Sequence, residues 1–166
     1  MITSKQIIKI SEKYSDSFML ESYATVKEAF EKLSTKEFIA YLSQLALPLL
    51  RQEPIFKQLS QSKVEILLND SLNKAIYIEY KTDVTNNNET FILDVNLSYH
   101  ISHQTIYLSS YINDKKTGQR NTLVRGQIVP NDKSVSSVQS MITKQAKKMT
   151  EKYNKLMTMP IRKYYW

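Results

Sequence analysis

The sequence contains no cysteine, which excludes a disulfide framework, a thiolate nucleophile and a zinc–thiolate site. Glycine occurs only at Gly118 and Gly126, whereas average usage of about 7% would give about eleven or twelve. A phosphate-cradling loop needs clustered glycines, so nucleotide binding of that kind is excluded too. The N-terminus lacks the apolar stretch of a signal peptide, and no window is apolar enough for a membrane span. We therefore expect a soluble protein of the cytoplasm or of a virion.

The chain has 166 residues, of which 42% are hydrophobic and 23% are charged. These fractions are typical of a globular protein, and this length is enough to bury well over half of the unfolded surface around one core. We expect residues 1–157 to form a single α+β domain and residues 158–166 to form a C-terminal docking tail.

Positive charge is concentrated in the last third of the chain. Residues 1–62 carry eight Lys/Arg and seven Asp/Glu, and residues 63–112 carry three and six. Residues 113–166 carry twelve and three, a net charge of +9, against +7 for the whole chain. A basic region of this kind attracts phosphate backbones or acidic proteins in a salt-dependent way.

The N-terminal third has the pattern of helices. Thr3 or Ser4 is suited to cap a first helix that ends near Tyr14, and a second helix is expected over residues 22–33.

The sequence Ser34-Thr-Lys-Glu37 is a capping box, in which each of the two terminal side chains bonds the other residue's backbone N–H. It predicts a helix that starts at residue 34 and that Pro48 should end or kink. Pro54 fits the first turn of another short helix, to about residue 60.

From residue 63 the apolar residues alternate with polar ones, which predicts strands with one buried face and one wet face. Residues 83–89 are rich in Asn and are expected to form a loop. The longest run has Phe91, Leu93 and Val95 on one face and Asp94 and Asn96 on the other. The sequence predicts a five-stranded antiparallel meander with strands near residues 63–68, 76–80, 91–101, 105–112 and 122–129.

A final amphipathic helix is predicted over residues 134–157. Its apolar positions follow steps of three and four, and lysines fall on the opposite face. The N-terminal helices and this last helix are the expected cover for the inner face of the sheet. The apolar positions are Val135, Val138, Ile142, Ala146, Met149, Tyr153 and Leu156.

Groups suited to catalysis are scarce. His100 and His103 lie beside a predicted turn, where two polar residues are ordinary, although a metal site with Asp94 is an alternative. Asp83 and Glu89 flank the same loop, which leaves a metal-dependent nuclease as a remote alternative. We predict no catalytic residue, no metal ligand and no cofactor.

The basic residues of the last third are candidate contacts for nucleic acid, although a solvated helix face is also often rich in lysine. Lysine outnumbers arginine by 19 to 4. This favours contact with the phosphate backbone over base readout, where arginine is the usual side chain. The candidate residues are Lys115, Lys116, Arg120, Arg125, Lys144, Lys147, Lys148 and Lys155.

The tail after Pro160 combines cations with aromatic side chains, which are over-represented among interface anchors. It either folds back on the domain or binds another subunit. Tyr77, Tyr107 and Tyr111 on the outer sheet face could add to such an interface, and Asp94 and Glu79 on that face favour protein over nucleic acid. The candidate partner-binding residues are Ile161, Arg162, Lys163, Tyr164, Tyr165 and Trp166.

These features together predict a non-enzymatic structural or assembly protein of a multi-subunit complex. A ring or connector-type component of a phage virion, close to nucleic acid, is one specific form, and its partners would be other protein subunits, including copies of itself. Two alternatives are a nucleic-acid-binding regulator that uses the basic C-terminal third and an inhibitor or adaptor that binds a host protein. Composition and pattern do not choose between them.

Overall fold

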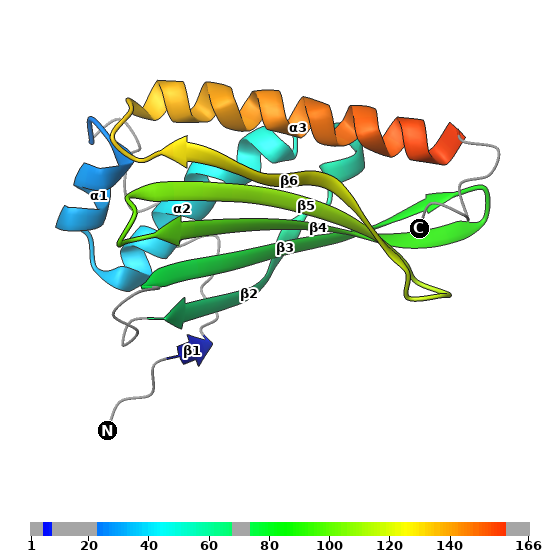
Figure 1. Ribbon diagram of the computed structural model, residues 1–166, viewed down its shortest axis with the longest axis horizontal. Coiled ribbons are helices and arrows are strands. Elements are labelled where there is room, and N and C mark those ends of the chain that lie inside the picture. The colour runs from blue at the N-terminus through cyan, green and yellow to red at the C-terminus, as the bar shows by residue number, and fades with distance from the viewer. Residues whose placement is uncertain (1–4, 8–22, 68–73, 159–166) are drawn as a thin grey trace.

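The protein folds as an α+β domain in which helices pack against one antiparallel sheet (Figure 1). The computed structural model describes residues 5–7, 23–67 and 74–158. The described elements are, in order, β1 (Lys5–Ile7), α1 (Val26–Lys32), α2 (Thr35–Leu50), η3 (Pro54–Phe56), β2 (Ser60–Leu67), β3 (Ala75–Asn86), β4 (Glu89–His100), β5 (Thr105–Asp114), β6 (Arg120–Pro130) and α3 (Val135–Thr158).

The sheet has the strand order β1-β2-β3-β4-β5-β6, and every neighbouring pair is antiparallel. The five-stranded meander predicted from the alternation is therefore confirmed. The three-residue strand β1 adds a sixth strand at the edge beside β2, where Gln6 is opposite Ile66. From β2 to β6 each strand pairs with the next through a short connection, whereas α1, α2 and η3 lie between β1 and β2 in the sequence.

The short helix expected from Pro54 to about residue 60 is only the three-residue 3-10 helix η3, and β2 begins at Ser60. The expected structures of residues 5–7 and 83–89 are wrong. Residues 5–7, placed in a helix by the sequence, form β1; isoleucines such as Ile7 are β-branched and favour extended backbone. Residues 83–89 are not a loop, because β3 and β4 continue to a two-residue turn at Asn87 and Asn88. Both have positive φ, 52° and 66°, which asparagine tolerates better than most residues.

The capping box is confirmed. Glu37 N donates to Ser34 Oγ at 3.2 Å, and Ser34 N donates to Glu37 Oε1 at 3.1 Å. The helix does not end at Pro48, which lies inside α2 two residues before its end. The missing proline N–H removes only one bond of the last turn, and Pro48 is exposed.

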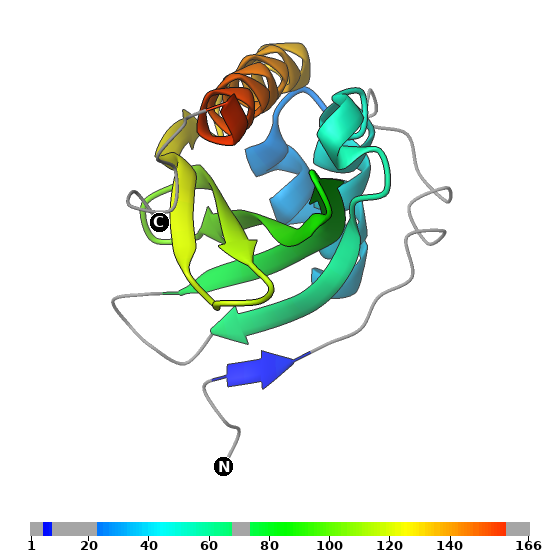
Figure 2. The ribbon, with the colours of Figure 1, turned by 90° about the vertical axis from the view of Figure 1, so that its right-hand side faces the viewer.

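All three α-helices lie on one side of the sheet (Figure 2). α3 packs on β5, β6 and α2, and each of its seven predicted apolar positions is buried. On the sheet, the same side carries the apolar positions of the strands, including Ile78, Leu97 and Leu108. The core therefore lies between the helices and this face, which we call the core face.

An aromatic cluster joins the first helices to the middle of the sheet. The ring of Tyr99 on β4 lies 4.8 Å from that of Phe38 on α2 and 5.0 Å from that of Phe30 on α1. The Tyr99 hydroxyl accepts a hydrogen bond of 2.7 Å from Asn131 Nδ2, and both residues are about 1% exposed. The Ser43 and Tyr80 hydroxyls are 2.8 Å apart and link α2 to β3. These contacts fix which face of the sheet the helices cover.

None of the described helices is both long enough and apolar enough to cross a bilayer.

Candidate binding site on the open sheet face

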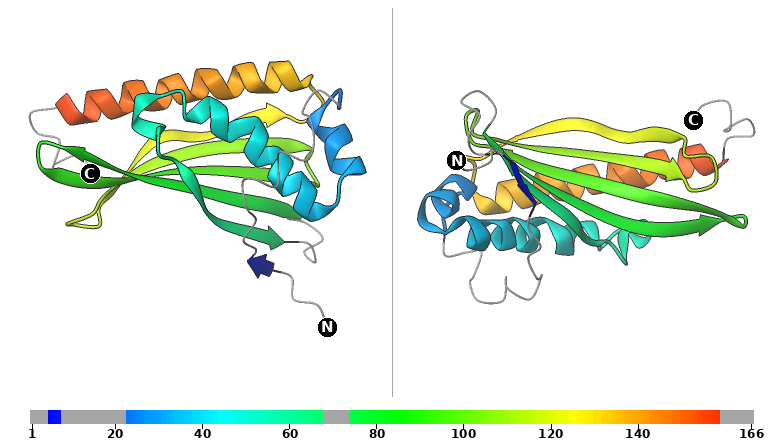
Figure 3. Two further views of the ribbon diagram at one scale, coloured as in Figure 1. Left: turned by 180° about the vertical axis from the view of Figure 1, so that it is seen from behind. Right: turned by 90° about the horizontal axis from the view of Figure 1, so that it is seen from below.

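The other side of the sheet is not covered by any described helix (Figure 3). It is formed by the residues that alternate with the core positions, and we call it the open face. The register places them in rows across β2 to β5. One row is Glu65, Tyr77, Ser98 and Tyr107, the next is Lys63, Glu79, Asn96 and Ser109, and a third includes Lys81, Asp94 and Tyr111.

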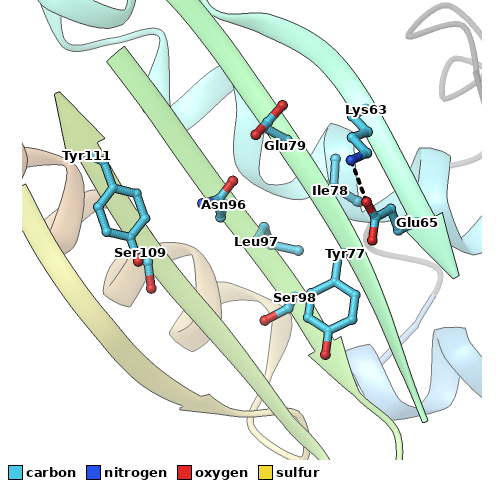
Figure 4. A pocket seen from close by; sticks show the side chains of 10 residues that line it. All are labelled: Lys63, Glu65, Tyr77, Ile78, Glu79, Asn96, Leu97, Ser98, Ser109 and Tyr111. Carbon is cyan, nitrogen blue, oxygen red and sulfur yellow. Dashed lines mark ion pairs between the residues drawn. The ribbon is translucent and has the colours of Figure 1, made fainter. Parts of the chain in front are cut away.

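A hollow of about 310 Å³ lies in the open face where these rows meet (Figure 4). Its middle is formed by the short side chains of Asn96, Ser98 and Ser109, with Tyr77 on one side and Tyr111 on the other. The hollow exists because small residues on the central strands are bordered by large ones. Its volume is at the lower end of that seen for ligand pockets and suits one large side chain.

Aromatic rings continue along the open face from the hollow. His100 makes edge-to-face contacts with Tyr107 at 4.5 Å and with Tyr77 at 5.8 Å. Its Nε2 lies 3.0 Å from Ser98 Oγ. Partial burial lowers the pKa of His100, and His103 lowers it further, so the imidazole is neutral at pH 7. His100 therefore adds an uncharged ring beside the Tyr107 ring and the Ser98 hydroxyl.

Charged side chains line one edge of the hollow. Lys63 forms an ion pair with Glu65, and Lys81 Nζ lies 3.6 Å from Glu79 Oε1. Ser62 Oγ also donates to Glu79 Oε1 at 2.9 Å. Two glutamates and one lysine line the hollow itself, and Lys81, paired with Glu79, brings the formal charge of this edge to zero. The edge therefore has no excess of positive charge with which to bind phosphate.

Asp94 is a buried carboxylate on the open face, about 5% exposed. Asn113 Nδ2 donates to its Oδ2 at 2.8 Å, and Arg120 Nη2 lies 3.6 Å from the same oxygen. Oδ1 has no hydrogen-bond partner. Burial raises the pKa of Asp94 although Lys81, Asn113 and Arg120 act to lower it. Desolvation prevails because the arginine is half exposed and beyond hydrogen-bonding distance.

The predicted nucleic-acid contacts fall into separate groups. Lys144, Lys147, Lys148 and Lys155 are exposed on the outside of α3, as the helical pattern predicts. Arg120 lies instead on the open face, where its guanidinium is 3.8 Å from the centre of the Tyr111 ring.

Of the remaining predicted contacts, Lys115 and Lys116 are in the turn after β5, and Lys115 Nζ is 3.6 Å from Asp83 Oδ2. Arg125 is exposed on β6. The structure therefore does not bring the eight residues onto one surface. The six predicted partner-binding residues, 161–166, lie outside the described residues.

Sequence reasoning placed Tyr77, Tyr107 and Tyr111 on the outer face correctly but did not find the hollow between them. The available signal was the run of small polar residues at 96, 98 and 109, which becomes meaningful only once the strand register is known. Metal binding finds no support in the described ranges, where no three His, Asp or Glu side chains gather.

Comparisons with protein-family models, curated proteins and solved structures find no match for this chain.

Proposed function

We propose that the protein is a non-enzymatic assembly component that binds a protein partner through its open face. The observation that carries the proposal is the uncovered side of the sheet, with a hollow bordered by tyrosines. Tyr77 is 38% exposed, one of two large hydrophobic side chains at this level among the described residues. Tyrosine is a frequent interface anchor because it offers a large rigid ring together with a hydroxyl.

The chemistry of the hollow favours protein over nucleic acid as the ligand. A sheet that binds single strands stacks bases on aromatic rings inside a positively charged groove. The open face has the rings, but each glutamate at the hollow is paired with a lysine and Asp94 lies near Arg120, so there is no excess of positive charge. A polypeptide segment needs no excess of positive charge and makes use of the hydroxyl and amide groups of Ser109 and Asn96.

Sedimentation velocity of the full chain tests this function. We expect a species larger than the 19.4 kDa monomer, formed either by several copies of the chain or by the chain and a co-purifying subunit. Asn96→Arg should reduce it to monomer, because the longer side chain fills the hollow. Asn154→Arg makes the same change on the exposed outside of α3 and should leave the mass unchanged. A wild type that is strictly monomeric and bound to nothing contradicts the proposal.

The role of a phage ring or connector-type component is the specific form of this proposal that the composition suggests. A ring would appear in the same experiment as a discrete species of fixed copy number. A stable complex with one different protein would instead favour the inhibitor or adaptor role.

Nucleic-acid binding is a second candidate, supported by the outside of α3. This helix carries Lys144, Lys147, Lys148, Lys152 and Lys155 against Glu151 alone, and four of these lysines are exposed. Changing those four to serine should abolish any salt-dependent binding of duplex DNA or RNA, measured by fluorescence anisotropy at low salt. Absence of binding by the wild type would rule this candidate out.

A further inference from the structure

One contact on the open face shows which chemistry this face accommodates. The Arg120 guanidinium lies over the Tyr111 ring at 3.8 Å, and its Nη2 is 3.6 Å from the carboxylate of Asp94. A guanidinium in this position gains attraction from the ring face and from the neighbouring negative charge. The open face therefore already binds one arginine between a tyrosine and an acidic residue.

A second tyrosine on this face has the same kind of surroundings. Tyr77 is directly opposite Glu65 in the register of β2 and β3, and it lines the hollow together with Glu79. The lysines paired with these glutamates are exposed by 45% or more, and ion pairs of this kind contribute little stability. An incoming arginine could exchange for them at small cost.

The sequence beyond α3 carries complementary groups. Residues 159–166 read Met-Pro-Ile-Arg-Lys-Tyr-Tyr-Trp, two cations beside three aromatic residues. Arg162 and Lys163 are opposite in charge to the two glutamates that line the hollow. Relying on the function proposed above, we propose that the hollow of one chain binds residues 161–166 of a second copy, with Arg162 against Tyr77 and the two glutamates.

The position of α3 favours a second copy over the chain's own hollow. α3 lies on the core face and ends at Thr158, whereas the hollow opens on the opposite face (Figures 2 and 4). Eight residues span about 29 Å at most when extended, and to reach their own hollow they would have to pass around the sheet edge. Contact with a neighbour's open face requires no such path.

Binding of this kind joins two different surfaces, so each chain would use its tail on one neighbour and its hollow on another. Such head-to-tail contacts generate a closed ring when the rotation between copies closes, and a filament when it does not. The inference therefore gives a physical route to the assembly role.

A peptide titration tests the contact directly. The probe is a dye-labelled peptide of residues 159–166, titrated by fluorescence anisotropy into the full-length Arg162→Glu chain, whose own tail should no longer compete. We expect saturable binding, weakened about tenfold or more by adding Asn96→Arg to the chain or Arg162→Glu to the peptide. Adding Asn154→Arg to the chain should have no effect. Equal binding to all three chains overturns the inference.

A mixing experiment tests whether two copies are joined. Asn96→Arg has a blocked hollow and an intact tail, and Arg162→Glu has the reverse. Each should sediment as a monomer, and a mixture should form a dimer that grows no further. Urea unfolding of each variant serves as the control that both variants fold.

The outcomes of these experiments separate this inference from the proposed function. If Arg162→Glu still assembles while Asn96→Arg does not, the hollow binds something other than the tail, and only this inference fails. If the wild type is monomeric and neither it nor the Arg162→Glu chain binds the peptide, both fail. If the wild type is monomeric and only the Arg162→Glu chain binds the peptide, each tail occupies its own hollow, and the second copy is excluded.

Discussion

The two faces of strand β4 differ in composition and in what they contact, although their residues alternate along one backbone. Leu93, Val95 and Leu97 are at most 1% exposed and face the helices. Asn96 and Ser98 face the other way, toward a hollow. Burial of the first set drives folding, because apolar surface removed from water contributes about 25 cal/mol per Å². The second set contributes little to that term, so its composition is free to serve binding.

Replacing a tyrosine on each face should give the largest contrast. Tyr99→Ala removes a ring buried against Phe30 and Phe38, and we expect it to lower the free energy of unfolding by about 3–5 kcal/mol. Tyr77→Ala on the open face should change it by only about 0.5 kcal/mol. Urea unfolding of both variants measures the difference. Equal losses would mean that the open face is part of the structural core.

A smaller effect is expected from the hydroxyl of Tyr99 alone. Tyr99→Phe keeps the ring but leaves the buried Asn131 Nδ2 without the acceptor it now has at 2.7 Å, so stability should fall by about 1–3 kcal/mol. Tyr107→Phe is the matched change on the open face and should be close to neutral in the same assay. Loss of stability in Tyr107→Phe but not in Tyr99→Phe would reverse the assignment of the faces.

The smallest of these stability effects is expected at Asp94, a buried carboxylate on the open face. Because its folded-state pKa is raised above the ordinary 3.8, its contribution to stability is fully present below that value. The contribution is lost as pH rises through the folded-state pKa. An amide side chain does not ionise, so Asp94→Asn should gain stability relative to wild type between about pH 4 and pH 7. Urea unfolding at both pH values measures this gain. A difference that is independent of pH would show that Asp94 titrates normally.

Much of the core face was predictable from sequence, and the open face was not. Apolar period and capping chemistry are local, so the Ser34–Glu37 box, the buried stripe of α3 and the inward residues of β4 were all identified. The hollow depends on Asn96 and Ser109 being neighbours across two strands, which is a property of register. Arg120 was assigned to a basic surface on charge alone, whereas its contacts with Tyr111 and Asp94 arise from the pairing of β4, β5 and β6.

The boundaries that sequence reasoning missed have physical causes as well. Asn87 and Asn88 read as loop residues, yet two consecutive left-handed asparagines make the tightest hairpin turn and let both strands continue. Residues 5–7 gained strand structure through pairing with β2, a contact distant in sequence. Local patterns do not contain information of this kind.

The most direct test of a binding open face is hydroxyl-radical footprinting of Tyr77 and Met141 across protein concentration. These side chains are exposed to nearly the same extent, 38% and 37%, on the open face and on α3. As the protein assembles, the reactivity of Tyr77 should fall several-fold, while Met141 should keep the reactivity it has in the monomer. Asn96→Arg should abolish the protection of Tyr77. Assembly that leaves Tyr77 as reactive as in the monomer, or that protects Met141 instead, would contradict the account.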